Sequence, residues 1–136
     1  MNMERKTIIL DGSLFDTMDG FYKQTARLLT DGKPGFTPGK NLNAFNDLLR
    51  GGFGAHEYGQ SLTLVWKNSA KSRKDLGYRA TERYYKALLR AHPERSQALL
   101  PHLRAAARRK GETLFDRIVA VITDPNQDHD VELRLE

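Results

Sequence analysis

Hydrophobic and polar residues follow two different periods along the chain, and each period predicts one kind of element. Short apolar runs at residues 6–10 (KTIIL) and 62–66 (LTLVW) contain β-branched side chains and predict buried strands. Strict alternation over residues 131–135 (VELRL) predicts a third strand that is covered on one face only.

Apolar residues spaced three or four positions apart predict several helices. The first covers about residues 17–29, and the second covers residues 41–50, with Asn41 as its N-cap and Gly51-Gly52 at its end. Further helices are centred on Tyr84–Leu89 and on Leu99–Ala106, and a last one covers residues 113–123. Pro101 is expected to break or kink the fourth of these helices.

The order of these elements is β-α-α-β-(several α)-β. Helical connections between successive strands favour parallel pairing through right-handed crossovers. The sequence therefore predicts an α/β fold, a small three-stranded parallel sheet packed by helices, with extra helices between strands two and three. With 136 residues and no internal repeat, a single domain over residues 1–136 is expected.

Composition excludes several classes of protein. The chain contains no cysteine, which rules out disulfide scaffolds, cysteine nucleophiles and thiolate metal sites. No segment approaches the ~20 apolar residues of a membrane span, and the N-terminus lacks the apolar run of a signal peptide. We therefore expect a cytoplasmic protein that has no membrane partner.

Positive charge is concentrated in one segment. Residues 67–110 contain 13 Lys and Arg against three acidic residues, a net charge of +10, whereas the remainder carries −5. This segment could bind nucleic-acid phosphates, complement an acidic partner or the acidic remainder of the chain, or simply form solvated helix faces. The side chains considered for such a surface are Arg104, Arg108, Arg109 and Lys110, with Arg73, Lys74, Arg79 and Arg83 beside them, and Tyr78, Tyr84 and Tyr85 as stacking surfaces.

Neither a catalytic nor a metal-binding motif is evident. The four histidines lack the spacing of a helical metal pair and have no partner in a recognised motif. Residues 124–130 resemble the start of an EF-hand loop, but His129 and Leu135 occupy the positions that require Gly and Glu, which favours a simple turn. We expect no enzyme activity, no cofactor and no metal site.

The helix at residues 41–50 combines an apolar face with an unusual polar face. Asn43, Asn46, Asp47 and Arg50 fall opposite the apolar residues at i, i+3, i+4 and i+7. The loop in front of it, residues 36–39 (FTPG), contains both proline and glycine. A capped helix behind such a loop can offer amides and one carboxylate to a polar, cationic cleft.

The pattern Gly39-x-Asn41-Leu42-x-Ala44-x-x-Asp47 resembles the barstar family, intracellular inhibitors of the bacterial ribonuclease barnase. The resemblance covers about residues 5–66 and 112–136, so residues 67–111 form a basic helical insertion. It implies a barstar-like fold and an immunity-type protein without chemistry of its own. In this family the second helix and the loop before it plug the ribonuclease active site, where carboxylates stand in for phosphates.

Carried over by position, Asp47 matches the main phosphate-mimicking aspartate of the family. Asn43, Asn46 and Lys40 stand where an aspartate, a tryptophan and a glutamate occur, and Thr37 and Pro38 replace two tyrosines. Asp116 is the only carboxylate within residues 113–123, and its register does not match the family glutamate. The partner-binding residues implied by the resemblance are Phe36, Thr37, Gly39, Lys40, Asn43, Asn46 and Asp47.

Two functions follow. The first is a ribonuclease inhibitor or immunity-type protein that occludes the active site of a bacterial ribonuclease or nuclease toxin. The alternative, with nucleic acid as a secondary partner, is a nucleic-acid-binding module that uses the basic helices within residues 67–110.

Overall fold

The computed structural model describes residues 4–33 and 37–136, and its strands form one parallel sheet. β1 (Lys6–Asp11), β2 (Leu62–Lys67) and β3 (Val131–Leu135) lie in the order β1-β2-β3. The register places Ile8 beside Leu64, and Leu64 beside Leu133. The predicted α/β fold with a three-stranded parallel sheet is confirmed.

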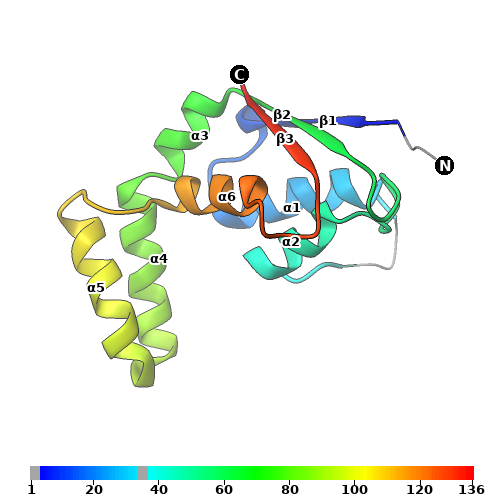
Figure 1. Cartoon of the computed structure of the whole chain (residues 1–136). Coiled ribbons are helices and arrows are strands. Elements are labelled where there is room, and N and C mark those ends of the chain that lie inside the picture. Colours follow the sequence, from blue (N-terminus) through cyan, green and yellow to red (C-terminus); the bar gives the residue numbers. More distant parts are fainter. Residues whose placement is uncertain (1–3, 34–36) are drawn as a thin grey trace.

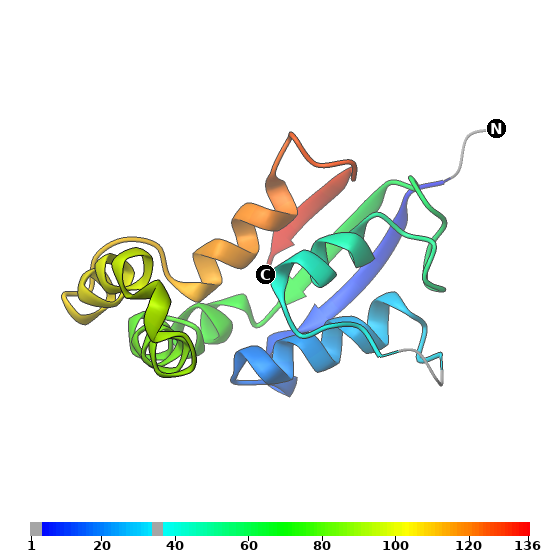
Figure 2. The same ribbon diagram turned by 90° about the horizontal axis from the view of Figure 1, so that it is seen from below.

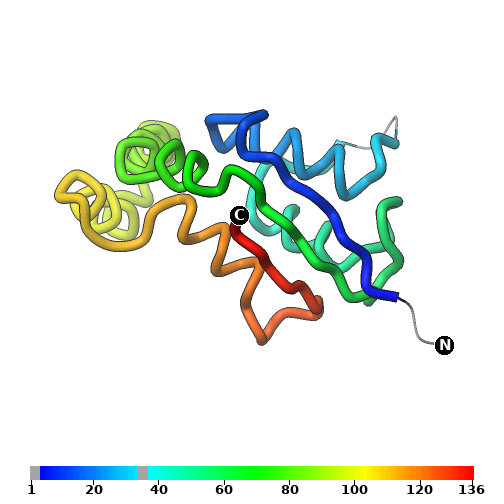
Figure 3. Tube along the Cα trace, turned by 90° about the horizontal axis from the view of Figure 1, so that it is seen from above, coloured from blue at the N-terminus to red at the C-terminus, as the bar shows by residue number. Residues whose placement is uncertain are grey.

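Helices cover one face of the sheet (Figures 1 and 2). These are α1 (Met18–Leu29), α2 (Leu42–Leu49) and α6 (Leu114–Thr123), which lie side by side beneath the strands. The opposite face is open to view in Figure 3, where the strands lie in front of these helices, and Ile9 on that face is 49% exposed. Side chains alternate between the two faces of a strand, so one face forms the core and the other meets solvent.

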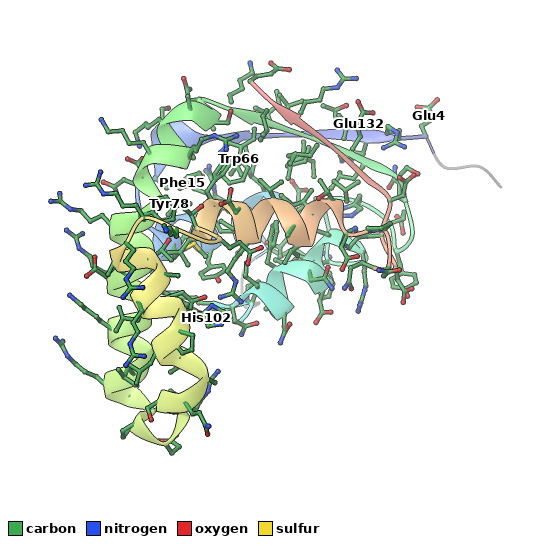
Figure 4. The ribbon with its side chains drawn as sticks, turned by 60° about the vertical axis from the view of Figure 1, so that its left-hand side comes forward. Glu4, Phe15, Trp66, Tyr78, His102 and Glu132 are labelled. Atoms are coloured by element: carbon green, nitrogen blue, oxygen red, sulfur yellow. The ribbon has the colours of Figure 1, made fainter. Side chains whose placement is uncertain are left out.

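Trp66 of β2 is the centre of the core. It is fully buried, and its ring centroid lies 5.0 Å from that of Phe115 and 5.7 Å from that of Phe21. Its indole Nε1 donates a 3.0 Å hydrogen bond to Ser72 Oγ, which satisfies the ring's single polar group. One side chain thereby ties the central strand to helices from both halves of the chain (Figure 4).

Three helices begin at residues whose side chains cap them. The side-chain oxygens of Thr17, Asn41 and Thr113 accept hydrogen bonds from backbone N–H groups at the starts of α1, α2 and α6. At α6 the Asp116 carboxylate also accepts the Thr113 backbone N–H at 3.0 Å, which completes a capping box. Asp116 therefore serves the start of its own helix.

A helical segment between β2 and β3 contains α3 (Ser69–Asp75), α4 (Tyr78–Ala91) and α5 (Ser96–Ala107). Two short 3₁₀ turns are also present, η1 (Gly12–Leu14) and η2 (Pro93–Arg95). Joined by η2, helices α4 and α5 form a hairpin that points away from the sheet (Figure 1). The hairpin has its own packing, since buried Tyr85 stacks on His102 with ring centroids 5.1 Å apart.

The helix around Pro101 differs from one expectation. A break or a kink at Pro101 was predicted, and α5 runs through this residue without a break. Proline inside a helix removes one hydrogen bond and costs about 3 kcal/mol. Packing against α4 offsets this cost, because Leu99 and Ala106, on either side of Pro101, are both buried at 4% exposure.

Candidate functional site

Helix α2 is held by its apolar face and by well-defined ends. Phe45, Leu48 and Leu49 are buried in the core. At the start, the Ala44 N–H donates to Asn41 Oδ1 at 2.7 Å. At the end, Gly51 has a φ of +89°, and a Cβ atom there would lie 2.2 Å from the carbonyl oxygen of Glu57. The position therefore requires glycine.

The outer face of α2 carries one exposed ion pair. Asp47 Oδ1 accepts a 2.9 Å hydrogen bond from Arg50 Nη1, with the carboxylate side chain 57% exposed. Asn43, one turn earlier, is also exposed. An exposed pair of this kind contributes at most about 1 kcal/mol to stability, so a partner can replace it at little cost.

Asn46 is fixed by residues from the far end of the chain. Its Nδ2 donates to Gln127 Oε1 at 2.8 Å, and its Oδ1 lies 2.8 Å from His129 Nε2. An amide oxygen can only accept a hydrogen bond, so the imidazole must donate from Nε2. The amide nitrogen and the amide oxygen of Asn46 are thus both hydrogen-bonded, and the orientation of the side chain is set before any partner binds.

The environment of His129 favours the neutral ring. Burial and the nearby Arg50 cation lower the pKa of His129 below its ordinary value, with a smaller opposing effect from Asp124. Its Nδ1 is buried and lacks a hydrogen-bond partner among the described residues. A neutral Nε2–H tautomer is consistent with both observations.

The segment from residue 124 to residue 130 is a fixed turn beside α2. Asp124 accepts hydrogen bonds from the Asn126 backbone N–H at 2.9 Å and from Gln127 Nε2 at 3.2 Å, and these bonds lower the pKa of its carboxyl group. At the other end, Asp130 accepts hydrogen bonds from Ser61 Oγ at 2.7 Å and Arg5 Nη2 at 3.1 Å. Asp124 therefore stays ionised close to the polar face of α2.

Two hollows flank this helix face. One of about 190 Å³ lies between α2 and α6, and another of about 550 Å³ lies at the C-terminal end of α2. The first is lined by Leu42, Asn43, Asn46, Ala120, Val121, Asp124 and Gln127, and the second by Asp47, Arg50, Gly51, Gly52, Phe53 and Tyr58. Tyr58 is 68% exposed, and exposed aromatic side chains are typical of interfaces.

The structure brings together part of the predicted partner-binding set. Asn43, Asn46 and Asp47 share one helix face, whereas Thr37 and Gly39 are exposed in the segment before it. Lys40 Nζ forms a 2.8 Å ion pair with Asp19 of α1. Phe36 lies outside the described residues.

Sequence reasoning missed four residues beside this face, namely Tyr58, Asp124, Gln127 and His129. The loop that carries the last three was interpreted only as a turn. Its oxygen-rich composition was the one feature that could have drawn attention to it.

Only some of the basic residues that the sequence suggested as a nucleic-acid surface lie together in the structure. Arg109 lines a hollow of about 750 Å³ with Lys74, Arg79 and Arg83, whereas Arg104, Arg108 and Lys110 are exposed outside it. Tyr84 and Tyr85 contact each other, and Tyr85 is buried, which confirms its packing role.

Lys71 and Arg73 of the basic segment contact the rest of the chain through neutral groups. Within residues 4–33 and 37–136, no ion pair within 4.0 Å joins residues 67–110 to the acidic remainder of the chain. Lys71 Nζ instead donates to the carbonyl oxygens of Gly12 at 3.3 Å and Phe15 at 2.9 Å, and the Arg73 guanidinium lies 4.6 Å from the centroid of the Phe115 ring.

Residues 4–33 and 37–136 contain neither a metal-binding cluster nor a helix that could span a membrane. In them, no three or more His, Asp or Glu side chains gather in a way that could hold a metal ion. Among their helices, none combines the length and the apolar character that crossing a bilayer requires.

The chain matches the model of a known protein family. The model of the barstar (barnase inhibitor) family matches residues 5–121, so the chain belongs to the barstar family. The members of this family are inhibitors of ribonucleases rather than enzymes. The match includes the whole of α3, α4 and α5 and ends within α6. No curated protein and no solved structure matches the chain significantly.

Proposed function

We propose that this protein is a cytoplasmic immunity-type inhibitor that occludes the active site of a bacterial ribonuclease or nuclease toxin. The observation that carries the proposal is the exposed Asp47 carboxylate on the rigid polar face of α2. A ribonuclease must bind the phosphates of its substrate, so its cleft presents cationic donors. A carboxylate on the exposed face of a fixed helix can occupy one such site.

The composition of the face suits a cleft of moderate positive charge. Asp47 and Asp124 supply two carboxylates, and Asn43 adds an exposed amide that can both donate and accept. Arg50 beside Asp47 reduces the net negative charge. The inhibitor would thus bind by hydrogen bonds and shape as well as by charge.

The rigidity of the polar face of α2 favours tight binding to a ribonuclease. Asn46 is held from both sides by Gln127 and His129, and the loop that carries them is fixed at Asp124 and Asp130. A surface that is ordered before binding loses less entropy when it meets its partner. Tyr58, at the edge of the larger hollow, adds an aromatic contact outside the polar centre.

The test is inhibition of the cognate enzyme by matched variants. We would identify this enzyme by capture from the lysate and secretome of the source organism, then measure inhibition of the purified ribonuclease. We expect Asp47→Ala to weaken binding by about 2 kcal/mol or more, the scale of interface hot spots, for which barnase and barstar are themselves a standard example.

Glu132→Ala is the control, because it removes the same charge from an exposed residue on the open face of the sheet. It should leave inhibition unchanged. Equal effects of the two substitutions would contradict the site, and failure of the wild-type protein to inhibit any captured ribonuclease would contradict the function.

A further inference from the structure

The groove beside α4, defined by the hollow of about 750 Å³, differs in charge from the rest of the surface. It lies between the α3–α4 segment and the C-terminal end of α5. Its cations are Lys74, Arg79, Arg83 and Arg109. Figure 4 shows nitrogen-tipped side chains projecting from this outer side of the hairpin.

The cations of this groove have no counter-ion within residues 4–33 and 37–136. Among the described residues, none of the four forms an ion pair within 4.0 Å. The groove also contains two carboxylates, but Asp75 pairs with Lys71, and Glu82 pairs with Lys86 at 3.2 Å. The charge left for a ligand is therefore positive.

Arg109 supplies a second, independent observation. It directly follows the C-cap residue of α5, Arg108, and adopts a φ of +56°. Its N–H donates to Ala106 O at 3.0 Å, and the Lys110 N–H donates to Ala105 O at 2.8 Å. This is the Schellman arrangement, in which the left-handed residue is usually glycine. An arginine there costs stability, and such strained positions concentrate at functional sites.

We propose that this groove binds the phosphodiester backbone of single-stranded nucleic acid. Three of its four cations are arginines, whose planar guanidinium groups match phosphate oxygens in a bidentate manner. Arg79 and Arg83 are one helical turn apart, with Cβ atoms about 5–6 Å from each other, so they can contact successive groups of one anionic chain.

The lining favours nucleic acid over an acidic protein. The apolar residues of the groove are Ala80, Ala106 and Ala107, so it offers no large aliphatic pocket for the anchor residues of a protein partner. Tyr78 is its aromatic residue, and its hydroxyl donates to Gly111 O at 3.0 Å, which fixes the ring in the groove that Arg109 also lines. A fixed aromatic ring next to cations is typical of surfaces on which bases stack.

The groove therefore carries a binding activity beyond the inhibition proposed for α2. It uses none of the residues of the α2 face, so the two activities can be lost separately. We would measure it by fluorescence polarisation with a labelled oligouridylate of about 12 nucleotides, within the usual range of site sizes for single strands.

The expected signature is a salt dependence. Four phosphate contacts predict a slope of about −3 for the logarithm of the association constant against the logarithm of salt concentration, because each contact contributes about −0.7. Arg79→Gln with Arg83→Gln should bring the slope to about −1.4 and weaken binding at least about tenfold at low salt. No polarisation change for the wild-type protein at about 50 mM salt would overturn the proposal.

A matched control removes the same charge from the same hairpin. Arg104→Gln with Arg108→Gln also changes two arginines one turn apart, but both lie outside the groove. At the same low salt concentration we expect this pair to weaken binding much less than the groove pair does, because neither side chain lines the groove. If the two double variants lost the same affinity for the oligonucleotide, the net charge of the hairpin would explain the loss. The proposal that the groove is the binding site would then be wrong.

Arg109→Gly separates binding from folding. Glycine suits the left-handed backbone, so the variant should unfold at an unchanged or higher temperature while binding the oligonucleotide several times more weakly. If Arg109→Gly bound the oligonucleotide as tightly as the wild-type protein, Arg109 would not be part of the binding site. Displacement of the oligonucleotide by polyglutamate as readily as by unlabelled oligouridylate would instead assign the groove to an acidic protein segment.

Discussion

The polar face of α2 and the groove on the α4 hairpin use charge in opposite ways. On and beside α2, three side chains are joined to neighbours, Lys40 to Asp19, Asp47 to Arg50, and Asn46 to two residues of the loop beyond α6, whereas Asn43 is exposed. In the groove, the arginines have no ion-pair partner among the described residues. One surface is arranged before binding, whereas the other keeps its charge for a ligand.

This difference predicts two kinds of interaction. A surface whose side chains are already fixed favours a specific partner, because little order remains to be gained on binding. A surface of unpaired cations attracts anionic chains with little regard to sequence, and salt weakens it steeply. Mutations that disturb only one region should therefore leave the other intact.

The largest effect is expected from Gly51→Ala, which breaks the end of α2. The substitution combines a left-handed φ with a close approach to the Glu57 carbonyl oxygen, so we expect the free energy of unfolding to fall by about 3 kcal/mol or more. Denaturant unfolding measures it. Gly52→Ala is the control, since it has the same φ of +89° but its nearest neighbour, Tyr58 Cβ, lies at 3.5 Å.

Strain alone predicts about 1–2 kcal/mol for that control. Where Gly51→Ala still folds, it should inhibit the ribonuclease poorly and bind oligouridylate normally. A parallel loss of both activities would show that the two regions are not independent.

Asn46→Ala should have the next largest effect. It removes the hydrogen bonds to Gln127 and His129 and leaves their polar groups with fewer partners, so we expect a loss of about 1–3 kcal/mol in the free energy of unfolding. Asn43→Ala, on the same helix face but without such bonds among the described residues, should change stability by less than about 0.5 kcal/mol. Similar losses from both variants would contradict a preformed face.

The smallest effect concerns pH. The pKa of His129 is lower in the folded protein than its ordinary 6.5, so the unfolded chain binds the proton more tightly. The stability contribution of His129 is therefore present above pH 6.5 and is lost as pH falls below that value. Arg50 and Asp124 face the ring, and Arg50 makes the larger contribution of the two.

We expect the free energy of unfolding to decrease between about pH 7.5 and pH 5.5, and His129→Gln to flatten this dependence. Glutamine can still donate to Asn46 Oδ1 but does not titrate. An identical pH dependence in both proteins would show that His129 does not control it.

The sequence predicted the elements whose apolar residues are regularly spaced. The strands, α1, α2, α4 and α6 all show this spacing, and Asn41 was correctly expected as a cap. Helix α3 was missed because its buried positions, Ser69 and Ser72, are polar and are recognisable only through the Trp66 indole that bonds to Ser72. Of the break or kink expected at Pro101, the break does not occur, because α5 packs against α4 in a way that no local pattern shows.

The candidate sites were predictable only within single helices. The sequence alone grouped Asn43, Asn46 and Asp47, because residues three or four positions apart lie on the same face of a helix. Gln127 and His129 lie 81 and 83 residues from Asn46, and no local pattern connects them. Likewise, Arg109 joins Arg79 and Arg83 only because the hairpin folds back on itself. The resemblance to barstar was confirmed by the family match.

The α4–α5 hairpin also has a consequence for the order of folding. β2 must pair with β3, and Leu62 lies beside Val131 only after the chain between them has been brought together. The contacts of the hairpin, such as Tyr85 with His102, close a much shorter loop and therefore form sooner. Once formed, the hairpin shortens the flexible chain between the two strands and lowers the entropy lost when they meet. We therefore expect it to act as an early folding unit that speeds the closure of the sheet.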